Sequence, residues 1–442
     1  MFRTVGKRTK VDHSVQKEKS SAGNALNQKA NRLNNLLKRS GKKRKNQLNI
    51  DVQLLLIVIT LIIFGLVMVY SASYDYSLNW YGNATEIFYR QLVWMTIGIG
   101  FAVVLVFIDY HEYKKYAVLA MAITVLALIG VLIANEVRNG AVRTLWGGSI
   151  QPSEMAKLVT IVYLAVWLSA KRDKLSNVSF GLIPLAVILG LFGGLILIQP
   201  DFSAVITIFI LGGLLFFLAG GDLKQIVILL LVALLIGWGI TQLSSTGAER
   251  IDHYLAGLKD PTQGSYHVRR SLEAIVKGGW FGVGIGEAET KLTGLPVPPT
   301  DSIFAVVGEE TGVVGSAFVV CLFGLLLWRG LIIARQAPDE LGSLLAAGLS
   351  LWIAVEVFIN MAVMVNLLPF AGNALPFISA GGSNLTVTLF AIGILLNISR
   401  VTVQNKEDRG SLYNAVVDLR RRDGRRSIPR NRRASSRNKK VH

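Results

Sequence analysis

Long apolar runs recur through the middle of the chain and are separated by short polar segments. A helix needs about 20 apolar residues to cross the hydrocarbon core of a bilayer. The pattern predicts ten membrane-spanning helices, at residues 52–72, 88–108, 116–134, 155–170, 179–198, 202–219, 225–243, 303–328, 343–366 and 384–400. The polar residues Gln199, Pro200 and Asp201 alone separate the fifth and sixth runs, which predicts a tight helical hairpin. The fold class is therefore an all-α polytopic membrane protein.

Basic residues gather in the two tails. Residues 1–50 contain 14 Lys and Arg against two acidic residues, and residues 401–442 contain 13 against four. Segments so poor in apolar residues do not fold alone, so we expect two disordered tails around a membrane domain at 51–400. Anionic lipids are the expected partner of the tails. Nucleic acid is excluded as a partner, because no stacking aromatic residues are interleaved with the arginine runs.

The distribution of Lys and Arg also predicts the orientation in the membrane. Cytoplasmic loops are enriched in these residues. The loops on the side of the tails carry them, whereas the opposite loops at 73–87, 199–201 and 367–383 carry none. We therefore expect both termini in the cytoplasm and the protein in the plasma membrane.

The composition agrees with a membrane protein and narrows the chemistry. The chain is 52% hydrophobic and 17% charged, with a net charge of +18, whereas soluble domains average about 25% charged residues. It contains a single cysteine, Cys321, and five histidines. A disulfide framework and a zinc site built from Cys and His are therefore excluded.

The segment between the seventh and eighth predicted spans, residues 244–302, is too long to be a simple connection. Val268, Leu272, Ile275 and Val276 recur in it at helical spacing. This spacing predicts an amphipathic helix at the outer membrane surface. The glycine-rich run at 278–286 does not form a nucleotide-binding loop, because it lacks a preceding strand and a Gly-Lys-Ser/Thr ending.

Two pairs of polar residues fall within a predicted span or at its end, where an unpaired charge is costly. Glu154 and Lys157 are three residues apart, so they either pair with each other or face a cavity. Glu356 and Asn360 are one helical turn apart and form either a structural hydrogen-bonded pair or part of a proton or ion path. The sequence leaves both choices open.

Asp301 lies where the long segment meets the eighth span. Asp is a favoured helix N-cap, and a functional carboxylate is the alternative. Glu309 and Glu310 follow on the same helix and point about 100° apart, so they do not both face one partner. Arg143 lies in a loop on the side where basic residues are otherwise absent.

At these positions the chain resembles the FtsW/RodA, or SEDS, family of cell-wall polymerases. The resemblance extends over residues 50–400 and rests on motifs in the same order. These are Tyr70-Ser71, Arg143–Glu154 followed by Lys157, Gln199-Pro200-Asp201, Asp260-Pro261, Thr300-Asp301 followed by Glu309-Glu310, and Leu375–Ser383. The long basic amino-terminal tail favours the division branch of the family over the elongation branch.

The chain also departs from the family pattern at five positions. The family has His before the Thr-Asp pair, Phe after it, a frequent Trp after the motif arginine, and Tyr and Ser in the last motif. The residues here are Pro299, Ser302, Thr144, Ala380 and Asn384. None of these changes affects the aspartate of the Thr-Asp pair.

The resemblance implies an inverting peptidoglycan glycosyltransferase that polymerises lipid II at the outer face of the membrane and releases a lipid diphosphate. It implies that Asp301 is the catalytic base. The substrate-binding candidates that it implies are Arg143, Glu154, Lys157, Gln199, Asp201, Ser379, Gly381, Gly382 and Ser383.

The diphosphate needs basic side chains, and a divalent cation is the alternative to them. The family also implies a class B penicillin-binding protein, a transpeptidase, as partner, together with other division or elongation proteins. Ten spans with acidic residues in them also suit two other classes. These are a flippase or transporter of the lipid-linked precursor, and a non-catalytic membrane scaffold for division.

Overall fold

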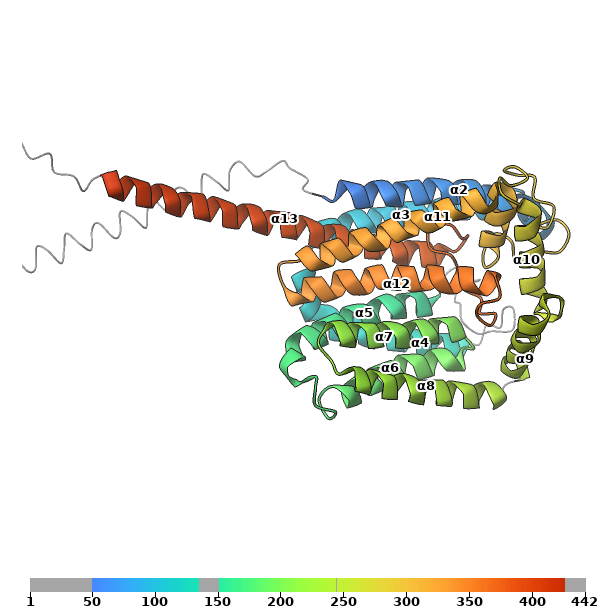
Figure 1. Cartoon of the computed structure of the whole chain (residues 1–442), viewed down its shortest axis with the longest axis horizontal. Coiled ribbons are helices and arrows are strands. Elements are labelled where there is room, and N and C mark those ends of the chain that lie inside the picture. Colours follow the sequence, from blue (N-terminus) through green and yellow to red (C-terminus); the bar gives the residue numbers. More distant parts are fainter. Residues whose placement is uncertain (1–49, 135–150, 244, 426–442) are drawn as a thin grey trace, which may run out of the picture. The chain divides into compact units, whose positions relative to one another are not determined.

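The computed structural model describes residues 50–134, 151–243 and 245–425, and residues 50–402 form one compact unit. Regular structure within these described ranges is entirely helical (Figure 1). Ten helices lie at the ten predicted spans. They are α2 (Val52–Tyr81), α3 (Glu86–Phe107), α4 (Tyr113–Ala134), α5 (Pro152–Lys171), α6 (Leu182–Ile198), α7 (Phe202–Leu218), α8 (Leu223–Leu243), α11 (Ile303–Gln336), α12 (Glu340–Met364) and α13 (Gly382–Arg425).

The length of each helix shows whether it is long enough to cross a membrane. Seven helices in the described ranges are long and apolar enough to cross a membrane, which makes the protein multi-pass. Three further apolar stretches, α6, α7 and Leu223–Gly239 of α8, are shorter. Seventeen residues span about 26 Å at 1.5 Å per residue, slightly less than the hydrocarbon core. The count of ten spans therefore stays a prediction.

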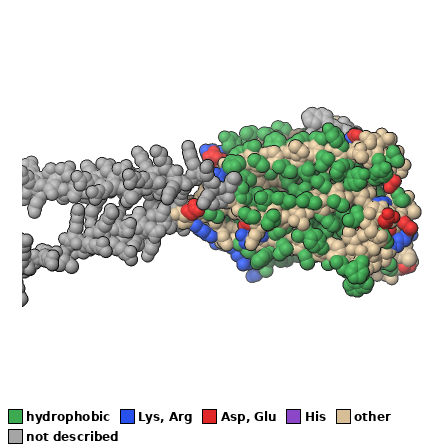
Figure 2. All heavy atoms as spheres, turned by 90° about the horizontal axis from the view of Figure 1, so that it is seen from above, with side chains coloured by type: hydrophobic (Ala, Val, Ile, Leu, Met, Phe, Trp, Pro, Cys, Tyr) green, Lys and Arg blue, Asp and Glu red, His purple; other side chains and the backbone are tan. Residues whose placement is uncertain are grey.

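The surface agrees with a protein surrounded by lipid. On the face drawn in Figure 2, hydrophobic side chains cover the middle, and charged side chains gather at its two ends. Many large apolar side chains on α3, α4 and α8 are exposed, among them Phe101, Leu126 and Leu234. A soluble protein rarely exposes so much contiguous apolar surface.

Helix α2 is longer than the apolar pattern predicts. Its predicted end at residue 72 is wrong, because the helix continues through a polar stretch to Tyr81. Asp51 caps its start by accepting a hydrogen bond from the Leu54 N–H at 3.0 Å. Gly82 ends it with a left-handed backbone, φ 69°, a conformation that glycine adopts without strain. The stop signal is therefore glycine rather than the loss of hydrophobicity.

The segment between α8 and α11 is itself folded, and we call residues 245–302 the cap. It contains α9 (Ser245–Lys259), the short 3₁₀ helix η3 (Pro261–Gln263) and α10 (Tyr266–Gly278). Helices α9 and α10 lie across one end of the bundle (Figure 1). The predicted amphipathic helix is confirmed as α10, whose buried face includes Val268 and Ala274, whereas Val276 is exposed.

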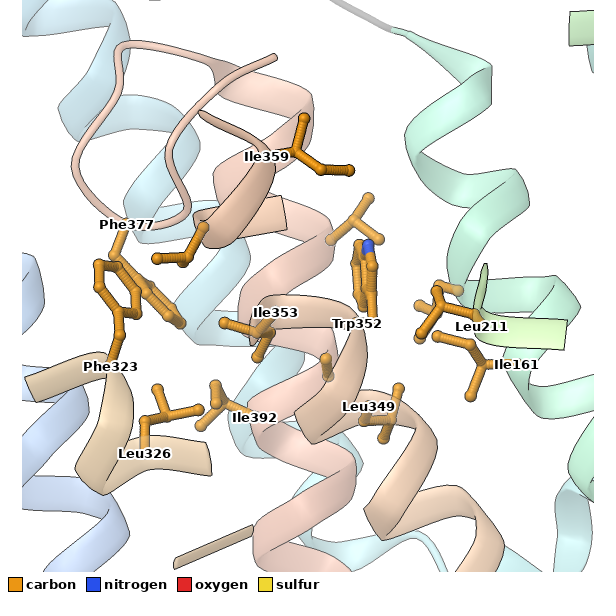
Figure 3. Packing of buried hydrophobic residues seen from close by; sticks show 14 of the residues in the cluster. Ile161, Leu211, Phe323, Leu326, Leu349, Trp352, Ile353, Ile359, Phe377 and Ile392 are labelled. Atoms are coloured by element: carbon orange, nitrogen blue, oxygen red, sulfur yellow. The ribbon is translucent and has the colours of Figure 1, made fainter. Parts of the chain in front are cut away.

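Helix α12 lies at the centre of the packing. It contacts α5, α7, α10 and α11. Figure 3 shows Trp352 of α12 facing Leu211 and Ile161, while Ile353 and Leu349 continue the same buried cluster. Helices in lipid associate through close van der Waals packing and hydrogen bonds. This packing holds the polar residues of α12 in fixed positions inside the bundle.

A kink in α11 anchors the glycine-rich run of the cap. Gly312 has φ 66° and ψ −164°, outside the helical region. The carbonyls of Gly279 and Trp280 accept hydrogen bonds from the N–H groups of Val313 and Val314, at 2.9 and 3.1 Å. The carbonyls of the glycine-rich run therefore replace helical hydrogen bonds that the kink removes. The glycines of the run have a structural role in this contact.

Candidate active site

Two adjoining cavities open at the end of the bundle covered by the cap. Their volumes are about 390 and 570 Å³, and we call them the polar lobe and the aromatic lobe. The two cavities share six of their lining residues, so they form one site with a common wall. These residues are Tyr76, Asp201, Ser203, Val297, Asp301 and Gly372.

Asp301 is half-buried on this common wall, and its backbone is held from two sides. The Asn360 side-chain amide donates a hydrogen bond to the Asp301 carbonyl at 3.1 Å. The neighbouring Thr300 carbonyl accepts one from the Ser379 hydroxyl at 2.8 Å. The capping alternative is wrong, because α11 begins at Ile303 with Ser302 as the N-cap residue and without a side-chain cap.

The polar lobe is lined mainly by amides, hydroxyls and backbone. Gln91 of α3 shapes it by donating to the Ser379 carbonyl at 3.1 Å and accepting from the Gly381 N–H at 3.2 Å. Gly381, Gly382 and Ser383 lie on its wall. Hydroxyl and amide groups at fixed positions are suited to recognising sugar hydroxyls.

Asp201 organises the junction of three segments. It is buried, caps α7, and accepts hydrogen bonds from Gln151 and Ser153 at 3.0 Å each and from Ser203 at 3.0 Å. These donors occupy both carboxylate oxygens. Asp201 therefore lines the site mainly as a structural acceptor.

A buried ion-pair group lies behind the polar lobe. Lys157 of α5 pairs with Glu154 at 2.8 Å and also with Glu356 of α12. Trp352 donates to Glu356 at 2.7 Å. Asn384 of α13 donates to both Glu154 and Glu356, at 3.1 and 3.3 Å. We call Glu154, Lys157 and Glu356 the triad; the predicted pairing of Glu154 with Lys157 is confirmed, and Glu154 also lines the cavity.

The predicted pair of Glu356 and Asn360 is connected indirectly. Asn360 donates to the Asn373 carbonyl at 2.5 Å, and the Asn373 side chain donates to the Glu356 carbonyl at 3.0 Å. Asn360 also holds the Asp301 carbonyl. Hydrogen bonds through Asn360 and Asn373 therefore link the backbone of Asp301 to the backbone carbonyl of Glu356, whose side chain belongs to the triad.

The aromatic lobe contains the side chains of Arg250 and His267. The guanidinium of Arg250 lies 5.8 Å from the ring of Phe370 and 6.0 Å from that of Phe202. The imidazole ring of His267 stacks on the ring of Phe370, with 4.2 Å between the two ring centroids. Phe370 therefore contacts both Arg250 and His267. Burial, and then the positive charge of Arg250, lower the pKa of His267 from 6.5 to about 4.

Glu309 and Glu310 face different partners, as their positions on one helix turn predict. Glu309 accepts hydrogen bonds from the backbone N–H groups of Glu289 and Thr290, at 3.1 and 3.2 Å. Glu310 accepts from Ser71 at 2.5 Å and pairs with Lys291 at 2.8 Å. Both carboxylates therefore attach the cap to the helix that follows Asp301.

The structure divides the remaining candidates into two groups. Glu154, Asp201, Asp301, Gly381, Gly382 and Ser383 line the polar lobe. Lys157, Gln199 and Ser379 lie behind its wall; Gln199, for example, donates to the Leu128 carbonyl at 3.0 Å. Arg143 lies outside the described residues. Across the described ranges, no three His, Cys, Asp or Glu residues gather as ligands for a metal ion.

Sequence reasoning missed several residues that line the two lobes. Tyr76, Arg90 and Gln91 come from α2 and α3, and Arg250 and His267 come from the cap. A polar residue in an apolar span, such as Gln91, was the available signal for the first group. The second group had no comparable signal, because charged residues are common in any surface helix.

Within the described residues, the fold and site define an all-helical, multi-pass membrane protein with a two-lobed cavity, lined by carboxylates, amides and hydroxyls, at one end of its bundle. The family model described as cell cycle protein, which covers FtsW, RodA and SpoVE, matches residues 52–404. The chain therefore belongs to the FtsW/RodA/SpoVE family.

Relatives agree along nearly their whole length. Stage V sporulation protein E of Bacillus subtilis (strain 168) is 38% identical over 355 residues, covering 79% of this chain and 97% of the relative. The probable peptidoglycan glycosyltransferase FtsW of Trichlorobacter lovleyi is 38% identical over 354 residues, covering 79% and 93%.

Two solved structures share the fold. One comes from work on the structural coordination of polymerization and crosslinking by a peptidoglycan synthase complex, with TM-score 0.66, 26% identity, and coverage of 80% of this chain and 99% of that one. The other is the rod shape determining protein RodA of Thermus thermophilus, with TM-score 0.59, 25% identity, and coverage of 79% and 97%.

Proposed function

We propose that this protein is a peptidoglycan glycosyltransferase that polymerises lipid II into glycan strands at the outer face of the plasma membrane. The observation that carries the proposal is the position of Asp301 on the common wall of two lobes. Two lipid-linked sugars must meet for a glycan to grow, and one carboxylate on the shared wall reaches a substrate in either lobe. Membership of a family with relatives named as probable peptidoglycan glycosyltransferases supports this choice.

The proposed chemistry requires a single base. A lipid diphosphate is a good leaving group and departs without a general acid. Asp301 removes the proton from the acceptor hydroxyl as that oxygen attacks the anomeric carbon of the donor from the face opposite the diphosphate, which inverts the configuration. A positioned base contributes roughly 10²–10⁴-fold to the rate. A glycosidase, in contrast, canonically requires two carboxylates.

The triad and its hydrogen-bond chain have a positioning role in this proposal. Lys157 is 2% exposed and lies between two carboxylates, so its charge is already compensated. It therefore holds the wall of the polar lobe rather than contacting the diphosphate. Gly381, Gly382 and Ser383 contact the sugar in this arrangement, and Asp201 fixes the wall between the lobes.

The proposal includes a partner and an orientation. The Ser-x-x-Lys spacing of a penicillin-binding protein occurs in this sequence only in the two basic tails, at residues 14–17, 40–43 and 436–439. We therefore assign the cross-linking of the glycan to another chain. A class B penicillin-binding protein has that chemistry, and a solved relative belongs to a complex that coordinates polymerization with crosslinking. Lipid II is presented outside the cell, so the cap is external and both termini are cytoplasmic.

The test is glycan synthesis by purified protein with lipid II as sole substrate in detergent. We expect wild-type protein with its transpeptidase partner to make glycan. We expect Asp301→Asn to fold and bind the partner but to lose activity by about 10² or more, because an amide cannot take the proton. Thermal unfolding and partner binding of both proteins provide the control.

The alternative classes give different results in the same assay. A flippase makes no glycan in detergent, where there is no second compartment. A scaffold makes none either, and it supports division equally well with Asn at position 301. Glycan synthesis by Asp301→Asn at the wild-type rate would falsify the role of Asp301 as base.

A further inference from the structure

The described residues on the walls of the two lobes include three carboxylates and two arginines. Glu154, Asp201 and Asp301 are acidic residues of the walls. A lipid-linked sugar brings a diphosphate with at least two further negative charges. The site therefore needs positive charge close to where the diphosphate lies, since a charge in a low-dielectric cavity is costly without a partner.

Two basic residues of the described chain line the lobes, Arg90 and Arg250. Arg90 in the polar lobe is paired with Glu86 at 2.8 Å, and its side chain is 50% exposed. Lys157 is enclosed by the triad. Arg250 belongs to the aromatic lobe, on a helix of the cap that no sequence motif singled out.

The position of Arg250 is set by aromatic side chains. Phe202 follows Asp201 at the start of α7, and Phe370 lies in the segment between α12 and α13. Contacts of a guanidinium with ring faces near 6 Å orient it through cation–π attraction. Arginine presents its planar donors in a fixed fork that matches phosphate oxygens. The lobe therefore holds a guanidinium whose position is fixed by two aromatic rings.

His267 adds a neutral hydrogen-bonding group beside this arginine. It lines the same lobe, and its Nδ1 atom is buried without a hydrogen-bond partner in the described part of the chain. A buried polar atom without a partner costs about 1–3 kcal/mol. A ligand oxygen or hydroxyl in the lobe would remove that cost, which is a second sign, independent of Arg250, that the lobe accepts a polar ligand.

We infer that the aromatic lobe is the diphosphate subsite of the donor and that Arg250 binds the leaving diphosphate. This inference rests on the proposed glycosyltransferase function. In the step, a bond forms between the acceptor oxygen and the anomeric carbon while the bond from that carbon to the diphosphate oxygen breaks. The proton goes to Asp301, and the electron pair leaves with the diphosphate. Arg250 then faces the oxygen on which negative charge grows.

The experiment compares wild-type protein with Arg250→Gln and Arg250→Lys. Each is assayed for glycan synthesis from lipid II and for inhibition by a polyprenyl diphosphate and the matching monophosphate. We expect Arg250→Gln to weaken inhibition by the diphosphate about 10- to 100-fold, the value of a hydrogen-bonded charge, with a much smaller change for the monophosphate. Arg250→Lys should restore part of the diphosphate affinity because it restores the charge without the fork.

Lys259→Gln is the matched control, because it removes one positive charge from the same helix at an exposed position outside both lobes. It should behave as wild-type. Unchanged inhibition by the diphosphate in Arg250→Gln overturns the inference, even if the rate falls. Direct binding of labelled polyprenyl diphosphate separates the proposed glycosyltransferase function from the proposed diphosphate subsite. If wild-type protein makes no glycan, the proposed function fails. The diphosphate subsite is then tested by the binding measurement alone, in which Arg250→Gln should bind the diphosphate more weakly than wild-type protein.

Discussion

The bundle interior and the cap each bury a lysine against carboxylates, but they use it differently. In the bundle, Lys157 lies between Glu154 and Glu356 with 2% of its side chain exposed. In the cap, Lys291 pairs with Glu310 with 5% exposed. The residue types and burial are nearly the same in the two regions.

The partners of the two lysines are the difference. The triad joins residues of α5 and α12 that are 199 positions apart, and Asn384 adds α13 to the group. Lys291 and Glu310 are 19 positions apart, and Lys291 also donates to the carbonyl of Gly286 at 2.8 Å. The first group therefore connects three helices of the bundle, whereas the second attaches the loop of the cap to α11 and, through Ser71, to α2.

The comparison teaches that burial alone does not tell what an ion pair stabilises. A pair between distant helices is lost only when the bundle opens, so it contributes to global unfolding. A pair within a neighbouring loop is lost in local opening, which needs less free energy. Removing the lysine from each region should separate these effects.

The largest effect is expected for Lys157→Met. It leaves Glu154 and Glu356 buried together without their cation, and breaking a buried pair in this way costs about 3–5 kcal/mol. Thermal unfolding of the purified protein in detergent should show a lower midpoint. Glycan synthesis should fall as well, since Glu154, which loses its cation, lines the polar lobe.

A combined variant tests the cause of that loss. Glu154→Gln, Lys157→Met and Glu356→Gln together remove all three charges, and neutral groups of similar shape replace buried ion pairs at little cost. We expect this variant to recover most of the midpoint. If the combined variant is as unstable as Lys157→Met alone, packing rather than charge is responsible.

Lys291→Met should have an intermediate effect confined to the cap. Loss of the cation leaves Glu310 buried with the Ser71 hydroxyl, which costs about 1–3 kcal/mol. Hydrogen exchange should become faster at Val283 and Gly284, whose N–H groups bind the carbonyls of Glu309 and Glu310. The global midpoint should fall less than in Lys157→Met.

The matched control in the cap is Lys277→Met. Lys277 is 38% exposed, and its carboxylate partners are 3.4 and 3.6 Å away, so its removal should change exchange very little. Equal exchange rates in Lys291→Met and wild-type protein would contradict the local role of Lys291.

The same distinction explains what the sequence predicts about this fold. Apolar runs predict the helices because each helix satisfies its own backbone, whatever its neighbours are. The spacing of Glu154 and Lys157 makes their pairing one of two alternatives for the same local reason, and the structure shows the pair. Glu356 as the third member of the triad has no local signal, since only the packing of α12 against α5 brings it there.

Errors at the ends of helices have a physical origin too. Hydropathy predicts that the first helix ends where the apolar residues end, at residue 72. The helix instead continues through polar residues to Tyr81, and Gly82, with a left-handed backbone conformation, ends it. Asp301 was assigned a capping alternative from its position before a span, yet the chain turns once more and Ser302 precedes the helix. Hydropathy reports the lipid boundary, whereas backbone geometry decides where a helix begins and ends.

Among the site residues, those close in sequence to a motif were predictable and those brought in by the cap were not. Asp301, Asp201 and Gly381 belong to motifs and line the polar lobe. Arg250 and His267 reach the aromatic lobe because α9 and α10 fold across the end of the bundle. No periodicity in the segment indicates that arrangement.

The smallest effect is expected for His267 in the cap and depends on pH. Its pKa is about 4 in the folded protein, against 6.5 as its ordinary value, because of burial and the charge of Arg250. Between these values the unfolded chain binds a proton that the folded chain does not. Stability is therefore complete above about pH 6.5 and falls as the pH is lowered toward 4.

His267→Gln removes this dependence, because Gln does not titrate. Between pH 7 and pH 5, we expect the unfolding free energy of wild-type protein to fall by about 1 kcal/mol more than that of the variant. This value is smaller than the change in the pKa of His267 implies, because part of the imidazole ring remains solvated. Arg250→Gln should reduce the same difference, since it removes the nearby positive charge that opposes protonation. Identical pH profiles for wild-type protein and His267→Gln would show that the imidazole gains its proton as easily in the cap as in the unfolded chain. Burial and the charge of Arg250 would then not lower the pKa of His267.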